Sequence, residues 1–132
     1  MFKKVYFLIL MFFIMNLVSA QESKNTSYVN LFISADKTIY VETEKTGFEN
    51  IEKKVSAIVR NMPFKPDQSI VYRIFADENL DLGYIMDVNQ KMISGYGENV
   101  RTQRFLLNTM KLNIDGQNWF DSIDMKDLKK ID

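Results

Sequence analysis

The chain has 132 residues with 17 basic and 17 acidic side chains, and it contains neither cysteine nor histidine. Disulfide bonds and thiol nucleophiles are therefore excluded, and the residue that most often serves as a neutral-pH general base or a zinc ligand is missing. After position 20, no run of basic residues is longer than a pair, so the sequence does not predict the basic surface that a nucleic-acid-binding protein needs.

Residues 1–20 have the pattern of a secretory signal peptide. Two lysines precede an apolar run over residues 5–18, which ends on small side chains suited to signal peptidase. As a helix this run spans about 21 Å, which is shorter than the roughly 30 Å hydrocarbon core of a membrane. We therefore expect cleavage before Gln21 and a periplasmic or secreted protein. The alternative is an uncleaved helix that anchors the chain in the inner membrane.

The remaining chain has the size of one domain. Without the leader it keeps 15 basic and 17 acidic side chains, and it offers no cysteine for a lipid anchor. Residues 21–28 are polar and are expected to form a flexible lead-in. The ordered domain is predicted to cover residues 29–109, and residues 110–132 are expected to form a C-terminal tail.

The domain opens with a predicted hairpin. Apolar residues alternate with polar ones over 29–35 and again over 38–42, which is the period of a half-buried strand. The pair Asp36 and Lys37 between them is typical of a tight turn. One face of this hairpin is therefore expected to meet a core.

A helix and a central strand follow. Over residues 48–62 the apolar side chains recur at steps of three and four, and Pro63 stops the helix; Thr46 and Glu49 are placed as a capping box. Residues 69–76 are apolar on both faces and rich in β-branched and aromatic side chains, which predicts a buried central strand.

The second half of the domain repeats this order. Asp77, Glu78 and Asp81 lack the pattern of a calcium loop and are interpreted as a charged turn. A weaker helical pattern begins at Leu82 and ends at the glycines 95 and 97, and a strand is expected over residues 100–108. The result is a ββαβαβ order, which predicts a two-layer α+β fold in which two helices pack on one face of a small sheet.

The tail carries a few large apolar side chains behind a turn at residues 115–116. Trp119 and Phe120 are the most prominent, and we expect them to pack on the domain, since burial is the usual role of such a pair.

Two local sequences resemble the periplasmic domain of the ExbD/TolR family, the small partner proteins of proton-driven motors in bacterial envelopes. The segment LFISADKTIYV over residues 31–41 is similar to the opening strand pair of that family, and RIFAD over 73–77, followed by Leu82-Gly83, is similar to its central strand and second helix start. The matching positions are Ala35, Asp36, Tyr40, Arg73, Ala76, Asp77 and Gly83.

The sequence also departs from that family. Lys37, Leu82 and Gln90 stand where members commonly have Gly, Tyr and Asp. Motor subunits further carry a full membrane-spanning helix with an aspartate, and the short leader has no acidic residue, so proton conduction by that route is not expected. The resemblance implies a close strand-to-helix entry at Gly83, where a larger side chain is expected to hurt folding.

The resemblance implies a non-enzymatic role, in which the protein binds a partner or scaffolds a transport system driven by the proton-motive force. Family domains pair as dimers through their sheets and contact envelope proteins or peptidoglycan. The strand at 100–108 is predicted to be a sheet edge that accepts a strand from another chain, with Arg101, Arg104 and Phe105 as partner-binding residues. The alternative is that the charged side chains of this strand protect the edge from pairing with another chain.

Two other function classes remain open. A secreted adhesion or peptide-binding module would use the same edges and tail without a motor. An exported enzyme would need convergent polar groups, and the candidates are Tyr40, Arg73, Asp77 and Asp87. No cofactor and no metal site is predicted.

Overall fold

The computed structural model describes residues 25–114 and 116–131, which form an α+β fold around one six-stranded sheet. The predicted leader, residues 1–20, lies outside the described residues. The strands are β1 (Thr26–Ile33), β2 (Ile39–Val41), β3 (Glu44–Lys45), β4 (Ser69–Asp77), β5 (Val100–Leu107) and β6 (Lys129–Ile131). The helices are α2 (Ile51–Arg60) and α3 (Leu82–Gly95), with the 3-10 segments η1 (Phe48–Asn50), η2 (Gly116–Ser122) and η3 (Met125–Asp127).

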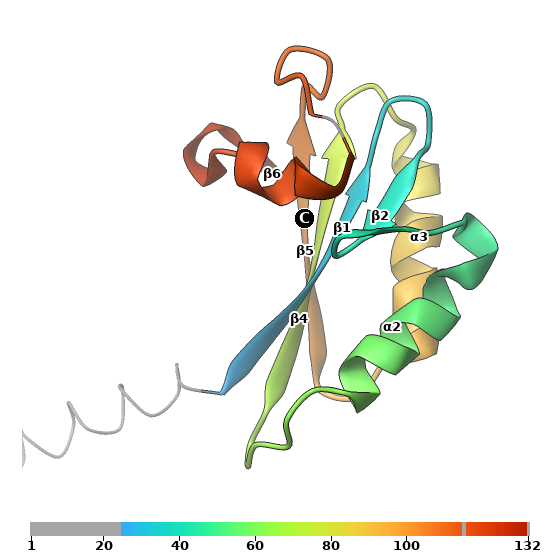
Figure 1. The fold of residues 1–132 in the computed structure, drawn as a ribbon, viewed down its shortest axis with the longest axis vertical. Helices are drawn as coiled ribbons and strands as arrows, with labels where there is room; N and C mark the ends of the chain where they lie inside the picture. The colour runs from blue at the N-terminus through green and yellow to red at the C-terminus, as the bar shows by residue number, and fades with distance from the viewer. Residues whose placement is uncertain (1–24, 115, 132) are drawn as a thin grey trace, which may run out of the picture.

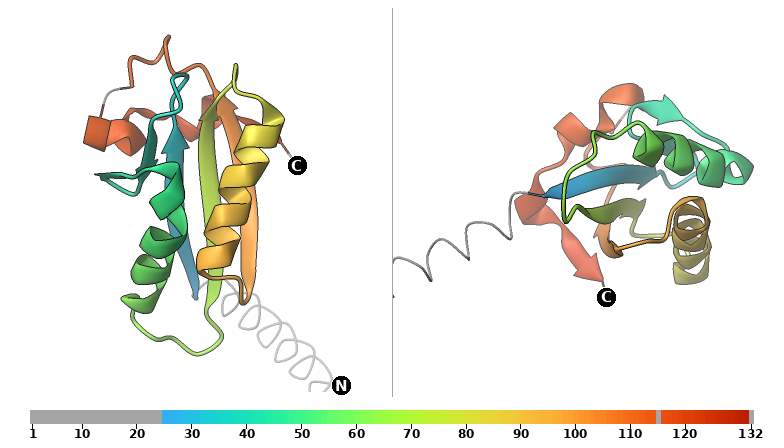
Figure 2. Two further views of the ribbon diagram at one scale, coloured as in Figure 1. Left: turned by 90° about the vertical axis from the view of Figure 1, so that its right-hand side faces the viewer. Right: turned by 90° about the horizontal axis from the view of Figure 1, so that it is seen from below.

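The strands lie in the order β3-β2-β1-β4-β5-β6, with β4 near the centre as predicted. β1, β4 and β5 are mutually parallel, and the short strands at both sides pair antiparallel. α2 and α3 cover one face of the sheet, and the 3-10 segments of the tail lie against the other face (Figures 1 and 2). The predicted fold class is confirmed, and β3 and β6 are added to the predicted strands.

The main core lies between the helices and the sheet. Alternate residues of β1 and β4 point into it, among them the fully buried Leu31 and Ile74, and they meet the buried faces of α2 and α3. The first helix is shorter than expected, because a 3-10 turn precedes α2. The predicted capping box is wrong: η1 begins after Gly47, and neither η1 nor α2 has a side-chain cap.

The predicted flexible lead-in is wrong over its last residues. β1 begins at Thr26, where it pairs with Ser69 at the start of β4. The side-chain amide of Asn25 also donates to the carbonyl of Pro66 at 2.8 Å, and that of Gln68 donates to the Ser27 hydroxyl at 3.0 Å. Polar side chains thus belong to the strand, because backbone pairing does not require apolar ones.

The tail is part of the fold. It packs on the face of the sheet opposite the helices, where Trp119 is 1 % exposed and stacks on Phe32 at a ring-centroid distance of 5.3 Å. Phe75 lies 5.4 Å from the same ring, and the indole N–H donates to the carbonyl of Glu42 at 2.7 Å. Residues on both sides of the predicted boundary at residue 109 therefore share one core.

Replacement of Trp119 by Ala is expected to lower the free energy of unfolding by about 3–5 kcal/mol, because it empties the centre of this second core. Met125, which is 45 % exposed on the same tail, is the matched control. Its change to Ala is expected to alter stability by less than about 0.5 kcal/mol. Chemical denaturation measures the free energy of unfolding of both variants. If Trp119→Ala changed it as little as Met125→Ala, the tail would be an appendage that does not contribute to the core.

Two glycines of α3 give a second stability test. A Cβ at Gly83 would meet no atom within 4 Å, so the expectation of a close approach there is wrong. A Cβ at Gly95 would lie 2.5 Å from the backbone oxygen of Glu52 on α2. The close approach of chain segments is therefore between the two helices at the end of α3, and not at its start.

We expect Gly83→Ala to stabilise the protein by about 0.5–1 kcal/mol, because it removes a helical glycine without a clash. Gly95→Ala is expected to destabilise it by about 1–3 kcal/mol, because α2 and α3 must move apart. Thermal melting of both variants decides the matter, and the reverse order of stabilities would contradict this packing.

Candidate functional site

The predicted edge strand β5 is only partly an edge. β6 pairs with Arg104, Phe105 and Leu106, so the strand is covered over its C-terminal part. Residues 100–103 have no second strand partner within the described chain, since β4 alone pairs with them. The sequence concealed β6 because two of its three residues are lysines, but lysine is a usual residue of an edge strand.

The three predicted partner-binding residues do not share one surface. Successive side chains of a strand point to opposite faces, so Arg101 and Phe105 lie on the face opposite the helices, together with Phe75 of β4. Arg104 lies on the helix side, in register with the core residue Ile74. A single ligand on one face of the sheet can therefore contact Arg101 and Phe105 but not Arg104.

A hollow of about 730 Å³ opens beside the uncovered part of β5. Its lining includes Lys65, Val100 and Arg101, together with Phe64, whose side chain is 92 % exposed. The backbone of an open strand, two cations, the carboxylate of Asp67 and a solvent-exposed aromatic ring thus lie close together at the foot of the sheet.

The same face of the sheet carries Arg73 at its centre, on β4. The guanidinium carbon lies 4.0 Å from the centroid of the Tyr28 ring and 5.4 Å from that of Phe120. Its Nε–H donates to the side-chain oxygen of Asn30 at 2.7 Å. Burial lowers the pKa of Arg73, while Tyr28 and Glu42 raise it, and a guanidinium remains charged at neutral pH in any case. We call Asn30, Tyr28, Phe120 and Arg73 the Arg73 clamp.

Three clamp residues, Tyr28, Asn30 and Phe120, were not recognised as site residues from the sequence. Tyr28 was placed in the flexible lead-in and Phe120 in the tail, although Tyr28 continues at every second position the series of Asn30 and Phe32, which point to the face opposite the helices. That alternation was the available signal. The contact of Phe120 with Arg73 has no sequence signal, because it joins residues of the tail and the central strand.

The turn after β1 contains the predicted motif residues Ala35 and Asp36. The Asp36 carboxylate accepts hydrogen bonds from the Ser34 hydroxyl and, at 3.1 Å, from the Thr38 N–H. These bonds lower the pKa of Asp36 to about 2. Lys37 has a φ of 65°, which explains why a glycine suits this position in the family that the segment resembles.

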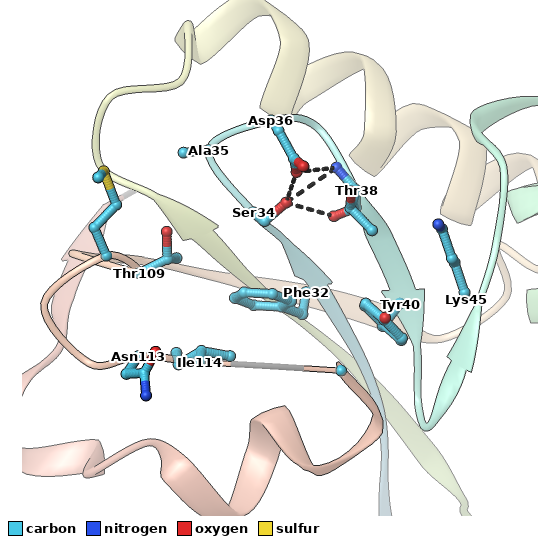
Figure 3. Close-up of a pocket in the computed structure, with 12 residues that line it drawn as sticks. Phe32, Ser34, Ala35, Asp36, Thr38, Tyr40, Lys45, Thr109, Asn113 and Ile114 are labelled. Carbon is cyan, nitrogen blue, oxygen red and sulfur yellow. Dashed lines mark hydrogen bonds between the residues drawn. The ribbon is translucent and has the colours of Figure 1, made fainter.

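This turn borders a second hollow, of about 470 Å³, between the β1–β2 connection and the tail (Figure 3). The ring of Phe32 lies at its centre beside Tyr40, and Lys45 and Asn113 lie at its sides (Figure 3). Its acidic group, Asp36, already takes part in the hydrogen bonds of the turn. One oxygen of this carboxylate therefore holds the turn together.

Asp77 at the end of β4 is fully buried and takes part in internal contacts. Its carboxylate accepts from the Thr109 hydroxyl at 2.6 Å, from the Thr109 N–H at 3.3 Å and from the Asn79 N–H at 2.9 Å. Burial raises the pKa of Asp77, but these bonds lower it by more, so it stays below the usual value. Ala76 lies in the main core, and Gly83 is exposed. Asp77 and Ala76 therefore have structural roles, whereas no contact of Gly83 explains its place in the motif.

The four candidate catalytic residues do not form one cluster. Tyr40 packs beside Phe32, and Asp77 is enclosed by its hydrogen bonds. Asp87 is exposed on α3, on the other side of the sheet from Arg73. Within residues 25–114 and 116–131, no three acidic side chains gather as metal ligands would.

No protein-family model matches the chain, and no curated protein is similar to it. The resemblance to the ExbD/TolR domain therefore depends on the quoted motifs alone.

Asp36 provides a test of the turn by pH. Because its folded pKa is about 2 against an ordinary 3.8, ionised Asp36 stabilises the folded state above about pH 4, and this contribution is lost as the pH falls toward 2. Carboxyl chemical shifts measured by NMR are expected to give the low pKa, and Ser34→Ala is expected to raise it toward 3.8. A pKa near 3.8 in the unaltered protein would contradict the hydrogen-bonded turn.

Proposed function

We propose that the protein is a non-enzymatic binding module of the bacterial cell envelope, similar in role to the periplasmic domain of ExbD/TolR proteins. In this role it binds a partner for a transport system driven by the proton-motive force, or scaffolds that system. The motifs at residues 31–41 and 73–83 support the family assignment, and the leader pattern supports export.

The observation that carries the binding role is the open part of β5. Residues 100–103 pair with β4 on one side and have no strand on the other within the described chain. An added strand there would continue the line of β6, and its backbone would pair with unpaired N–H and C=O groups. Arg101 and the hollow beside it supply side-chain contacts on the same surface.

Two kinds of polypeptide partner fit the open backbone of residues 100–103. An extended segment of an envelope protein can add to it as a strand, and a second copy of the chain can pair with it to form a homodimer. Peptidoglycan is the other ligand class implied by the resemblance, and the exposed Phe64 beside Lys65 and Arg101 would contact it. A secreted adhesion or peptide-binding module would use the same edge.

Proton conduction is not part of this role. None of the helices in the described portion of the chain is long and apolar enough to cross a membrane. The leader, which lies outside that portion, carries no aspartate or glutamate for a proton to occupy. The module would therefore act beside a proton-conducting subunit.

Site-specific photo-cross-linking in the native host tests the proposal. A photoreactive residue in place of Thr102, on the open part of β5, is expected to capture an envelope protein, and the same residue in place of the exposed Lys53 on α2 is not. Capture of a membrane motor component supports the motor role, and capture of a second copy supports the dimer. Capture of only cell-surface material supports the adhesion alternative. Equal capture from both positions, or none from either, contradicts binding at this edge.

A further inference from the structure

The Arg73 clamp holds a guanidinium that forms no direct ion pair within the described part of the chain. Arg73 lies on the central strand and is half-buried, but no carboxylate of the described residues lies within 4.0 Å of its guanidinium. The ion pairs found among the described residues lie elsewhere and join Lys54 to Glu44 and Lys91 to Glu49. A partly desolvated cation in a protein is usually paired. The nearby Glu42 raises the pKa of Arg73 by its charge, and one of its carboxylate oxygens accepts from the N–H of Asn30 at 2.7 Å, but it does not reach the guanidinium as a direct ion pair.

The guanidinium is fixed in place before any ligand arrives. Its Nε–H is used by Asn30, and the rings of Tyr28 and Phe120 lie near it. The two terminal nitrogens donate to no acceptor of the described residues, and their fork matches the two oxygens of a planar carboxylate. A fixed side chain loses less conformational entropy on binding than a free one.

The surroundings of the clamp favour a negatively charged, partly apolar ligand. On this face of β4, β5 and β6 the charged residues are Arg73, Arg101 and Lys130, apart from the buried Asp77. Gln103 lies directly opposite Arg73 and adds a neutral hydrogen-bonding group. Tyr28 and Phe120 are 45 % and 39 % exposed, so their rings present apolar surface next to the cation.

We propose that the Arg73 clamp is a binding site for the carboxylate of a partner polypeptide, either an acidic side chain or a chain terminus, flanked by apolar residues. A polypeptide is favoured because the open backbone of residues 100–103 lies on the neighbouring strand of the same sheet. The proposal rests on the proposed function and deepens it, because it names the chemistry that the partner must present.

A peptide titration tests this site separately from partner capture. The capped peptide Val-Phe-Glu-Phe-Val is added to the full-length protein while the NMR signals of the Arg73 Nε–H and the Asn30 amide are followed. Saturable shifts are expected, and the same peptide with Gln in place of Glu is expected to bind about tenfold more weakly.

Variants of the protein complete the test. Arg73→Lys keeps the charge but loses the fork, and about tenfold weaker binding is expected. Arg60→Lys, on the exposed surface of α2, is the control and is expected to bind as the unaltered protein does. Melting temperatures confirm that each variant is folded, and Tyr28→Leu provides a second clamp variant that keeps Arg73.

Several results would overturn the site. These are equal binding of the Glu and Gln peptides, an equal loss of affinity in Arg73→Lys and Arg60→Lys, and the absence of saturable shifts. Tighter binding of inorganic phosphate than of the peptide would make it a phosphate site, and tighter binding of galacturonate would assign it to sugar carboxylates. If the titration fails while cross-linking at position 102 succeeds, the binding module remains and only the clamp is refuted.

Discussion

The burial of Trp119 against the second face of the sheet is the constraint on which the arrangement of this protein depends. The parallel strands β1, β4 and β5 carry buried apolar side chains on both faces, and such a parallel sheet is covered on both. α2 and α3 cover one face, and no α-helix of the described residues lies on the other. The tail takes that place with one large indole, stacked on Phe32 and held to the Glu42 carbonyl. What the tail covers and what it leaves open then decide which groups a partner can reach.

Two of the motif residues that the sequence singled out, Asp36 and Asp77, have structural roles. The Asp36 carboxylate accepts hydrogen bonds from Ser34 and Thr38 and so stabilises the turn after β1. The Asp77 carboxylate accepts from Asn79 and Thr109 and so joins the end of β4 to the loop after β5. The open part contains Arg73, and the tail contributes to it by bringing Phe120 next to the guanidinium. The same segment therefore closes the second core and forms one wall of the proposed binding site. The open length of β5 completes the surface.

Local periodicity predicted most of the fold. The alternation before Asp36, the apolar strand at 69–76 and the helical spacing after Leu82 each gave an element that the structure contains. Three features could not be predicted from periodicity, namely the Thr26–Ser69 pairing, the strand β6 and the Arg73 clamp. The pairing of Thr26 with Ser69 and the short strand β6 depend on backbone hydrogen bonds, to which polar side chains give no clue. The separation of Arg101 from Arg104 follows from their odd spacing and was available in the sequence. The Arg73 clamp was not, because Tyr28 and Phe120 are far apart in the chain.

Trp119 is the single tryptophan, so its fluorescence reports on the tail alone and tests the central claim directly. If the tail and the sheet form one cooperative unit, the native emission is blue-shifted and resists quenching by acrylamide. The fluorescence transition in denaturant then coincides with the loss of secondary structure measured by circular dichroism. An emission typical of water-exposed indole, or a fluorescence transition at a lower denaturant concentration than the circular dichroism transition, would contradict the account.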